Sequence, residues 1–595
     1  MDLTLEQRLL RFLAREEDGE RRSHRDLLAQ PIDVRVLDGE CIFGARFVRA
    51  DAGVFWFHVR DNTSKFRAGD TVLVGDGHDL DGSVPLVFGS YDAGTGELRL
   101  ESDPYARDAE AGFDAAAAYV VDRRALGLRG RLREVVAAAF ADGRLAAILD
   151  GRHELEIDEA RYGRAVTSLR AAGLNPAQVE AGARAIATES LALVQGPPGT
   201  GKTRLLAEVA AALCAAGCRI ALTAFTHRAV DNALLAIRRA APALTLVKVA
   251  TTGSDGDQDL RDAGIPRVDP RRARLPETHA VVAGTCYQLH KLGDKERFHY
   301  TVIDEAGQLP IPHALAGMLR SRRWLLFGDH EQLPPVVTAE HRDREAAQSI
   351  FAHLHARYGS QLLDTSYRMN DGVCSVVSAT FYGGRLHSAP AVAARRLPFV
   401  AGGRLDEVLD PSHPVVWLRI DHRQPGSRCV EEANAVADVV EDLVRQHGVA
   451  AADVAVIAPF RAQVAALRAA IDQRQLTGAA GLVVDTVERI QGQEREVVIV
   501  SLTAGDPDEA RGRGAFHLSE NRLNVALSRA RTKVVLVASA HSFRALPGDV
   551  EALRTASRCR ELRDRLHEVD LTRLYAGRVG EARRGGAASS SAASS

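Results

Sequence analysis

Long hydrophobic runs and targeting signals are absent from this sequence. None of its apolar stretches reaches the roughly 18 residues from which a membrane-spanning helix is recognised. The chain starts MDLTLEQRLLRFLAREEDGE, which lacks the basic beginning and the apolar core of a secretory signal peptide. These absences predict a cytoplasmic protein that has no membrane partner.

Cysteine is scarce and scattered. The seven cysteines include one close pair, Cys214 and Cys218, which lies about one helical turn apart in an alanine-rich stretch. Disulfide frameworks and zinc sites show repeated, closer spacings of cysteine. The pair therefore indicates thiols buried on a helix face, and metal binding is the less favoured alternative.

An excess of charge of one sign is missing as well. The chain has 76 Lys and Arg against 78 Asp and Glu, which gives a formal net charge of −2. Any contact with nucleic acid must therefore come from a local groove or stripe, because the overall field is not positive. Apolar residues, in contrast, make up 46% of the 595 residues, enough to bury several cores.

Changes in hydrophobic period divide the chain into segments. Helical spacing at the start gives way near residue 34 to alternating and β-branched runs such as VFWFHV, which predict a small antiparallel barrel. Helices rich in Ala, Leu and Arg follow. The predicted segments are a helical stalk (1–33), the barrel (34–105), a second helical stalk (106–170), two cores (171–345 and 346–548), a helical extension (549–584) and a disordered, low-complexity tail (585–595).

Short apolar strands alternate with helices from residue 191 onward. The first series runs from LALV to RWLLFGD and the second from VVWLRI to KVVLVAS. Such alternation is typical of parallel sheets that helices cover on both faces. The predicted fold class is α/β, with two parallel-sheet cores in tandem behind a small β-barrel on helical stalks.

A glycine-rich loop, GPPGTGKT, joins strand LALV to helix TRLLAEVAAAL. This is the context of a phosphate-binding loop, in which backbone N–H groups surround the phosphates. Lys202 is placed to reach the β- and γ-phosphates, and the Thr203 hydroxyl to bind Mg²⁺. The sequence thus predicts ATP and Mg²⁺ as ligands, with the nucleotide-binding residues Gly196, Pro197, Pro198, Gly199, Thr200, Gly201, Lys202 and Thr203.

Carboxylates follow a later strand of the same series. Strand YTVI leads into Asp304 and Glu305, at the sheet edge where the phosphate loop is expected. We expect Asp304 to hold Mg²⁺ and Glu305 to deprotonate the attacking water. The next strand ends in GDHEQ, whose Gln332 is placed to sense the γ-phosphate by hydrogen bond.

Further segments resemble the motifs of superfamily 1 helicases, in the order in which that family carries them. The resemblance spans residues 174–540 and implies that both cores are RecA-like P-loop domains. The matching segments are LNPAQ (Q motif), TAFTHRAVDNAL (Ia), GTCYQL (Ic), DEAGQ (II), GDHEQLPP (III), SYRM (IV), VDTVERIQGQEREVVIVSL (V) and RLNVALSRAR (VI).

The form of these motifs is similar to one branch of the superfamily. DEAGQ, AVDN and IQGQE resemble the nonsense-mediated-decay helicase, the immunoglobulin mu-binding helicase and the replication helicase-nuclease, which implies 5′-to-3′ movement. THRAVDNAL and GDHEQLPP look closest to the helicase-nuclease, which weakly favours DNA over RNA. Residues 1–165 contain only Cys41, so neither that family's iron–sulfur nuclease nor a zinc module is expected.

The resemblance also assigns roles around the nucleotide. It implies that Gln178 contacts adenine and that Tyr367 stacks on it. Arg368 and Arg529 match two arginine fingers, which would bring positive charge to the γ-phosphate and raise the rate about 10³- to 10⁵-fold. Glu494 resembles a motif V carboxylate that touches the nucleotide. With Glu305 and Gln332, the two arginines complete the predicted catalytic set.

The same comparison implies a track for nucleic acid. Hydroxyl, imidazole and guanidinium groups in motifs Ia, Ic and V and after strand VAVIAP match positions that touch the phosphate backbone without reading sequence. Phe225 stands where base stacking is conceivable. The predicted contacts are Thr226, His227, Thr285, Arg461 and Thr486.

The motifs predict an ATP-dependent helicase or translocase that moves along single-stranded DNA or RNA. Two alternatives use the same motifs without unwinding, namely an ATPase that remodels protein–nucleic acid complexes and an ATP-gated clamp. A P-loop kinase is disfavoured because the second core would have no purpose. The family resemblance implies a monomer, and the sequence leaves open protein partners that it does not identify.

Overall fold

The computed structural model describes residues 3–574, apart from 52, 67–69, 79–81, 103–111, 125–128, 251–256, 271–273, 294, 423–425, 477–480, 491, 504, 506–518 and 545–549. The predicted tail, 585–595, lies outside the described residues. Contacts divide the chain into two compact units. The first holds Met1–Val194, Thr203–Gly328 and Pro334–Ser360; the second holds the described residues of Gln195–Lys202, Asp329–Leu333 and Gln361–Ser595.

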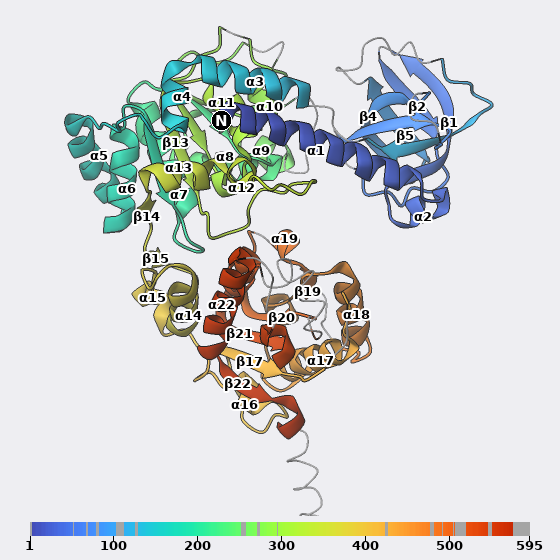
Figure 1. Ribbon diagram of the computed structural model, residues 1–595, viewed down its shortest axis with the longest axis vertical. Helices are drawn as coiled ribbons and strands as arrows, with labels where there is room; N and C mark the ends of the chain where they lie inside the picture. The colour runs from blue at the N-terminus through green and yellow to red at the C-terminus, as the bar shows by residue number, and fades with distance from the viewer. Residues whose placement is uncertain are drawn as a thin grey trace, which may run out of the picture. The chain divides into compact units, whose positions relative to one another are not determined.

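Six antiparallel strands close the predicted barrel, which is drawn in blue in Figure 1. Side chains alternate across its wall, so that Phe55, Phe57, Leu98 and Leu100 fill the interior. The strand order is β1-β2-β5-β4-β3-β6. The strands are β1 (Cys41–Asp51), β2 (Val54–His58), β3 (Thr71–Gly75), β4 (Val84–Asp92), β5 (Glu97–Ser102) and β6 (Ala118–Arg123).

The barrel extends beyond the predicted end at residue 105. Strand β6 lies in the segment 106–170, for which helices alone were predicted, and it pairs with both β1 and β3. Without β6 these two strands would be left as open edges. Val120 and Val121 are buried in the barrel wall, so a short β-branched run closes it.

Helices precede and follow the barrel. Helix α1 (Leu5–Leu28) begins at a capping box between Thr4 and Gln7, and its apolar face, including Leu9 and Phe12, packs in one core with residues of α3. The other helices of these segments are α2 (Ile32–Leu37), α3 (Arg129–Ala141), α4 (Gly143–Leu149), α5 (Glu159–Ala171) and α6 (Pro176–Ala187).

Within the first unit, the described strands of the α/β sheet follow the order β10-β9-β11-β8-β12-β13-β7. Neighbouring strands from β10 to β13 are parallel. The strands are β7 (Leu191–Gln195), β8 (Arg219–Thr223), β9 (Thr245–Val249), β10 (Arg267–Val268), β11 (Ala280–Ala283), β12 (Tyr300–Ile303) and β13 (Trp324–Gly328). The helices are α7 (Lys202–Ala215), α8 (His227–Ala240), α9 (Asp257–Asp262), α10 (Cys286–His290), η1 (Ala306–Gln308), α11 (Ile311–Met318), α12 (Arg344–Ala347) and α13 (Ile350–Tyr358).

The first core continues past the predicted boundary at 345. Helix α13 buries Ile350, Phe351 and Leu354 in the same hydrophobic cluster as strands β12 and β13. The first unit therefore ends at Ser360. The spacing of apolar residues shows that a helix has an apolar face, but it does not show which core that face packs against.

The second α/β core is a six-stranded, all-parallel sheet in the order β19-β18-β20-β21-β17-β22. Neighbouring residues of one strand, such as Val534 and Val535, belong to two different buried clusters, so both faces are covered. The strands of this unit are β14 (Gln361–Leu362), β15 (Thr365–Ser366), β16 (His387–Ser388), β17 (Val415–Arg419), β18 (Val454–Ala458), β19 (Val483–Thr486), β20 (Arg495–Ser501), β21 (Ala530–Ala538) and β22 (His567–Asp570).

The helices of the second unit include α22, in the segment predicted as a helical extension, 549–584. That prediction missed strand β22, which adds to the sheet beside β17 because Val569 joins the buried cluster. The helices are α14 (Asp371–Phe381), α15 (Pro390–Ala393), α16 (Asp406–Leu409), α17 (Val430–Arg445), η2 (Ala451–Asp453), α18 (Arg461–Asp472), α19 (Val487–Ile490), α21 (Glu520–Leu527), η3 (Ala540–Arg544) and α22 (Val550–Asp564).

Among the residues that the structure describes, every helix is too short or too polar to cross a bilayer.

Candidate nucleotide and nucleic-acid sites

The predicted phosphate-binding loop lies between β7 and α7. Gly199 and Gly201 have φ angles of +75° and +78°, in the left-handed region that favours glycine. Inside the loop, the Thr200 hydroxyl donates to the Pro197 carbonyl at 2.7 Å. A Cβ on Gly196 would come within 2.9 Å of three side-chain carbons of Lys202, so that lysine folds closely over the loop.

The predicted acids, Asp304 and Glu305, follow β12, a strand of the same sheet as β7. Strand β12 lies one strand away from β7 and leads directly into Asp304, which is buried. The backbone N–H of Asp304 donates to the Thr223 carbonyl at 2.9 Å, and its Oδ1 accepts the N–H of Glu305 at 2.9 Å. Both carboxylates thus follow the carboxyl end of β12, which is parallel to its neighbours β8 and β13.

Glu305 has a strained backbone. Its φ of +51° lies in the left-handed region, where a residue with a Cβ costs about 1–2 kcal/mol. The amide Nε2 of Gln308 donates to its Oε2 at 3.2 Å. Strain of this kind gathers at functional sites, where the surrounding structure holds the residue in place.

Asp329, which directly follows β13, is a hub of hydrogen bonds, and no role was predicted for it. Its Oδ1 accepts from Gln195 Nε2 at 3.0 Å, and its Oδ2 from Gln332 Nε2 at 2.8 Å and from the Tyr382 hydroxyl at 2.7 Å. Burial raises the pKa of Tyr382, which therefore stays a protonated donor. The Gln332 amide also lies 3.4 Å from the Gly196 carbonyl, so Gln332 touches both the hub and the phosphate loop.

The SYRM segment contacts the phosphate loop inside the second unit. The backbone N–H of Tyr367 donates to the Gly199 carbonyl at 2.8 Å, and the Ser366 hydroxyl to the Pro198 carbonyl at 3.1 Å. A Cβ on Gly199 would lie 2.5 Å from Cβ of Arg368. The Tyr367 side chain is 44% exposed, as a residue that stacks on a base needs to be.

Arg368 and Arg531 share one carboxylate. Glu494 accepts from Arg368 Nε at 2.7 Å through Oε2 and from Arg531 Nη2 at 2.6 Å through Oε1. Burial raises the pKa of Glu494, but hydrogen bonds from Arg531 and Arg368 outweigh it, and the net pKa is lowered. Two predicted site residues, Arg368 and Glu494, are therefore in direct contact. Arg531, the last residue of the SRAR segment, contacts the same carboxylate but was not predicted as a site residue.

Two other predicted nucleotide residues have local structural partners. Gln178 is buried and closes the capping box at the start of α6, where its Oε1 accepts the N–H of Asn175 at 3.0 Å. Arg529 is buried, and its Nε donates to the Val525 carbonyl at 3.0 Å. Their roles toward adenine and the γ-phosphate stay predictions.

The predicted nucleic-acid contacts of the first unit lie at helix starts. Thr226 is exposed and caps α8, where its hydroxyl accepts the N–H of Ala229 at 3.2 Å. His227 follows it and is half-buried. Thr285 precedes α10 and is buried. The exposed ring of Phe225 lies 6.2 Å from the ring of His313 in an edge contact.

In the second unit, the predicted contacts follow two neighbouring strands of the sheet, β18 and β19. Arg461 is the first residue of α18 and is exposed. Thr486 is the last residue of β19 and is half-buried. Each of these two side chains therefore stands at the carboxyl edge of the second parallel sheet.

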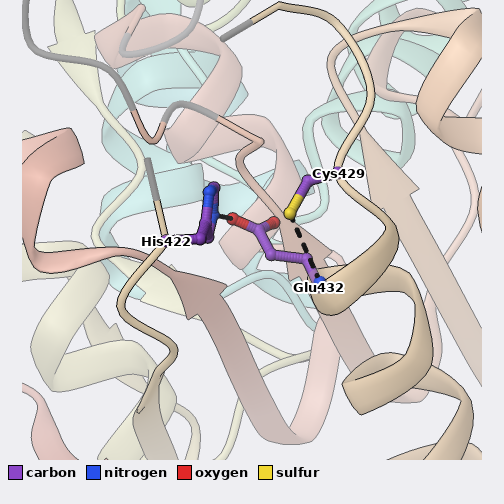
Figure 2. Close-up of side chains that lie close together, drawn as sticks. All are labelled: His422, Cys429 and Glu432. Carbon is purple, nitrogen blue, oxygen red and sulfur yellow. Dashed lines mark hydrogen bonds and ion pairs between the residues drawn. The ribbon is translucent and has the colours of Figure 1, made fainter. Parts of the chain in front are cut away.

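Three buried residues of metal-ligand type meet in the second unit. Figure 2 shows His422, Cys429 and Glu432 side by side. One potential ligand atom of each lies within 4.8 Å of the other two. Hydrogen bonds already occupy the carboxylate, because Glu432 Oε1 pairs with His422 Nε2 at 2.9 Å and Oε2 accepts from Ser501 at 2.6 Å and from the Thr503 N–H at 3.0 Å.

Cys429 Sγ in this group caps α17, accepting the N–H of Glu432 at 3.4 Å. Burial raises the pKa of the Cys429 thiol to about 12, so it remains a thiol, whereas metals bind the thiolate. The group is therefore a hydrogen-bond network that ties the start of α17 to the end of β20.

The phosphate loop, the acids that follow β12 and the two parallel-sheet cores define a P-loop nucleotide-binding protein. Two family models, each described as an AAA domain, match residues 173–395 and 346–541. Together with the order of the motifs, these matches and the relatives below make the chain similar to superfamily 1 helicases of the DNA2-like branch. The resemblance seen in the sequence is thereby confirmed.

Similar proteins include the "DNA replication ATP-dependent helicase/nuclease DNA2" of Mus musculus, 30% identical over 407 residues, 63% of this chain and 38% of that protein. The helicase/nuclease JHS1 of Arabidopsis thaliana is 28% identical over 63% of this chain and 29% of its own length. The chain thus spans less than two fifths of these relatives. A solved Arterivirus nonstructural protein 10 helicase is 14% identical, with coverages of 86% and 80% and a TM-score of 0.37, too low to support an argument.

Proposed function

We propose that this protein is an ATP-driven motor that moves along single-stranded nucleic acid, 5′ to 3′. The observation that carries the proposal is the contact between the phosphate loop and the SYRM segment, where Gly199 touches Tyr367 and Arg368. An arginine finger next to the phosphate loop would link ATP hydrolysis to movement of the second core. The helicase names of the relatives support the same activity.

The residues around the loop have the chemistry for ATP hydrolysis. Thr203 and Asp304 offer the oxygen ligands that Mg²⁺ prefers, and the ion would neutralise charge on the β- and γ-phosphates. Lys202 would bind the same phosphates, and Glu305 would take a proton from the attacking water. Gln332, which already contacts Gly196, would report the γ-phosphate to the Asp329 hub.

Single-stranded DNA is the track that we favour over RNA. Two observations support this preference. The names of the relatives describe DNA replication helicases, and the motif Ia segment THRAVDNAL and the motif III segment GDHEQLPP resemble those of the replication helicase-nuclease. Hydroxyl groups at Thr226 and Thr486 suit contacts with phosphate oxygens that read no sequence. We expect the protein to bind most single strands of DNA with little sequence preference.

The first test is steady-state ATP hydrolysis with no polymer, single-stranded DNA, single-stranded RNA and duplex DNA, at two salt concentrations. We expect the strongest stimulation from single-stranded DNA, weakened by salt because phosphate contacts release counterions. Stimulation by RNA alone would correct the track. No stimulation by any polymer would overturn the motor and favour a switch that waits for a protein.

A second test separates movement from remodelling. Duplexes with a single-stranded tail at either the 5′ or the 3′ end are offered with ATP, and strand release is followed. Release from the 5′-tailed duplex alone is the expected result for 5′-to-3′ movement. Stimulated hydrolysis without release from either duplex would favour the alternative of an ATPase that remodels protein–nucleic acid complexes.

A further inference from the structure

Residues 329–333, here called the sensor loop, are held to helix α21 by their backbone. Asn521 Nδ2 donates to the first and third of three consecutive carbonyls of the loop, at 3.0 and 2.6 Å. Asn524 Nδ2 donates to the middle one at 2.7 Å. The two asparagines lie three residues apart, so their side chains share one face of the helix. The three carbonyls are those of His330, Glu331 and Gln332.

Asn524 is fully buried and keeps an unused acceptor. Its two N–H groups donate to the carbonyl of Glu331 and, at 2.8 Å, to the hydroxyl of Tyr382. Its Oδ1 accepts no hydrogen bond from any residue that the structure describes. A buried acceptor without a donor destabilises a fold. The asparagine is therefore explained by its two donors, which hold the sensor loop and Tyr382.

The side chain of Gln332 is tied to the same helix through Tyr382. The Tyr382 hydroxyl accepts from Asn524 and donates to Asp329 Oδ2 at 2.7 Å, and Gln332 Nε2 donates to the same oxygen at 2.8 Å. Asn521 meanwhile holds the backbone carbonyl of Gln332. Both the backbone and the side-chain amide of Gln332 are thus fixed from α21.

Gln332 meets the phosphate loop through its longest contact. Its amide lies 3.4 Å from the Gly196 carbonyl, against 2.8 Å from Asp329 Oδ2. Hydrogen bonds weaken steeply beyond normal length, so a small displacement of the sensor loop would break the contact with Gly196 first. The fit of the loop on α21 therefore decides whether Gln332 stays against the phosphate loop.

The end of α21 contacts both predicted arginine fingers. The carbonyl of Val525 accepts from Arg529 Nε at 3.0 Å, and the carbonyl of Ser528, directly after the helix, accepts from Arg368 Nη1 at 3.0 Å. The helix has eight residues, a length of roughly 12 Å, and buries its apolar side chains in the core of the second unit. The sensor loop, α21 and both arginines belong to that one unit.

We propose that Asn521 and Asn524 are positioning residues for Gln332: they fix the sensor loop on α21 so that the Gln332 amide stays against the phosphate loop. The proposal rests on the proposed ATPase function, in which Gln332 senses the γ-phosphate. Because Arg368 and Arg529 are held by the same helix, one short element places both the sensor and the groups that bring positive charge to the γ-phosphate.

The activity test compares Asn524→Leu and Asn521→Leu with a matched control, Asn434→Leu. Asn434 is exposed on α17 of the same unit. We expect Asn524→Leu to lower kcat for ATP about 10- to 100-fold, the effect of a misplaced catalytic group, while KM changes less than about 3-fold. Asn521→Leu keeps the contacts of Asn524 and should have a smaller effect, and Asn434→Leu should match the wild type.

A double-mutant cycle with Gln332→Ala shows whether Asn524 acts through Gln332. If it does, Asn524→Leu should reduce kcat less than about 2-fold in the Gln332→Ala background, because coupled residues are not additive. An equal reduction in both backgrounds would sink the proposal. So would a lower Tm in Asn524→Leu with an unchanged kcat, since that is the outcome of a merely structural role.

Hydrogen exchange gives a readout that needs no activity. Asn524→Leu and Asn521→Leu should each speed amide exchange of the sensor loop in the nucleotide-free protein, while Asn434→Leu should leave it unchanged. Wild-type exchange of the loop in both variants would overturn the proposal. If the wild type hydrolysed no ATP with any polymer, the proposed function would fail, and the exchange of the loop would still decide whether the two asparagines hold it.

Discussion

Glu305 combines backbone strain with the position of a catalytic base. A left-handed φ of +51° is costly for a residue with a side chain, and glycine would remove that cost. A carboxylate held in a strained backbone beside the buried Asp304 indicates a residue kept for its chemistry. Stability and activity should therefore respond to substitution in opposite directions at this position.

Three substitutions test this. Glu305→Gln should lower ATP turnover at least about 100-fold, since the base is lost, and should still bind a fluorescent ATP analogue. Glu305→Gly should be equally inactive yet more stable by about 1 kcal/mol, from relief of strain. Lys202→Ala should lose both turnover and nucleotide binding. If both Glu305→Gln and Lys202→Ala still turned over ATP, the predicted ATP hydrolysis site would be wrong.

Glu331, next to Gln332, should make stability depend on pH. Burial raises its pKa from 4.5 to about 7, and Arg558 only partly offsets this. A carboxyl whose folded-state pKa is raised contributes stability below pH 4.5, and that contribution is lost as the pH rises through about 7. The shift corresponds to roughly 3 kcal/mol at ~1.4 kcal/mol per pKa unit.

Glu331→Gln should remove this dependence. The variant should match the wild type near pH 4.5 and unfold at higher urea concentration above pH 7, because its neutral amide avoids a buried charge. Arg558 keeps its ion pair with Glu520 at 2.5 Å, so the partner is not left alone. Urea midpoints measured from pH 4.5 to 8 check this, and parallel curves for the two proteins would contradict it.

At the scale of elements, the barrel depends on one buried ion pair. Arg35 of α2 donates to Asp122 of β6 at 2.5 Å and to the Gly77 carbonyl at 2.7 Å, and both side chains are almost fully buried. Burial raises the pKa of Asp122, against the effect of Arg35. Removing one partner of such a pair typically costs about 3–5 kcal/mol, because the other charge stays buried.

Arg35→Ala should therefore destabilise the barrel and leave the second unit unaffected. Hydrogen exchange should accelerate in peptides that cover β1, β3 and β6, and should stay unchanged in the strands of the second unit, which has its own core. The double variant Arg35→Met with Asp122→Leu should exchange more slowly than Arg35→Ala, since no charge is left unpaired. Uniform acceleration across the chain would argue against a separate barrel core.

The sequence predicted those elements that can be recognised from the pattern of neighbouring residues. The phosphate loop lies between a strand and a helix, and the acids follow a strand end, because motif and period are properties of neighbouring residues. The hub at Asp329 was not predictable, since Gln195 and Tyr382 reach it from 134 and 53 residues away. Strand β6 and the first-core position of α13 were missed for the same reason: tertiary pairing decides them.

Glu16 illustrates this limit most clearly. In the sequence it is one of several charged residues in a helical stretch, and charged residues are mostly exposed. Only the contacts with Thr338, Ala339 and His341 distinguish it from Glu17. Burial of a carboxylate follows from the donors around it, and those donors lie more than 300 residues along the chain.

At the scale of the whole molecule, a net charge of −2 excludes long-range attraction as the source of nucleic-acid binding. Affinity then depends on the few groups that touch the strand. Among the predicted contacts, Thr226, Thr285 and Thr486 carry neutral hydroxyls, which displace no counterions, while Arg461 carries a permanent charge and is exposed. Each cation on a phosphate of a single strand contributes about −0.7 to the slope of log K against log salt.

The salt dependence of binding therefore separates the two kinds of contact. Arg461→Ala should weaken binding to single-stranded DNA and make the slope shallower by about 0.7. Thr226→Ala should weaken binding at every salt concentration while leaving the slope unchanged, and it should destabilise α8 by about 1 kcal/mol through loss of the N-cap. Fluorescence anisotropy from 50 to about 300 mM salt measures both. Equal slopes for Arg461→Ala and the wild type would exclude Arg461 as a phosphate contact, and the cations that touch the strand would then be other residues.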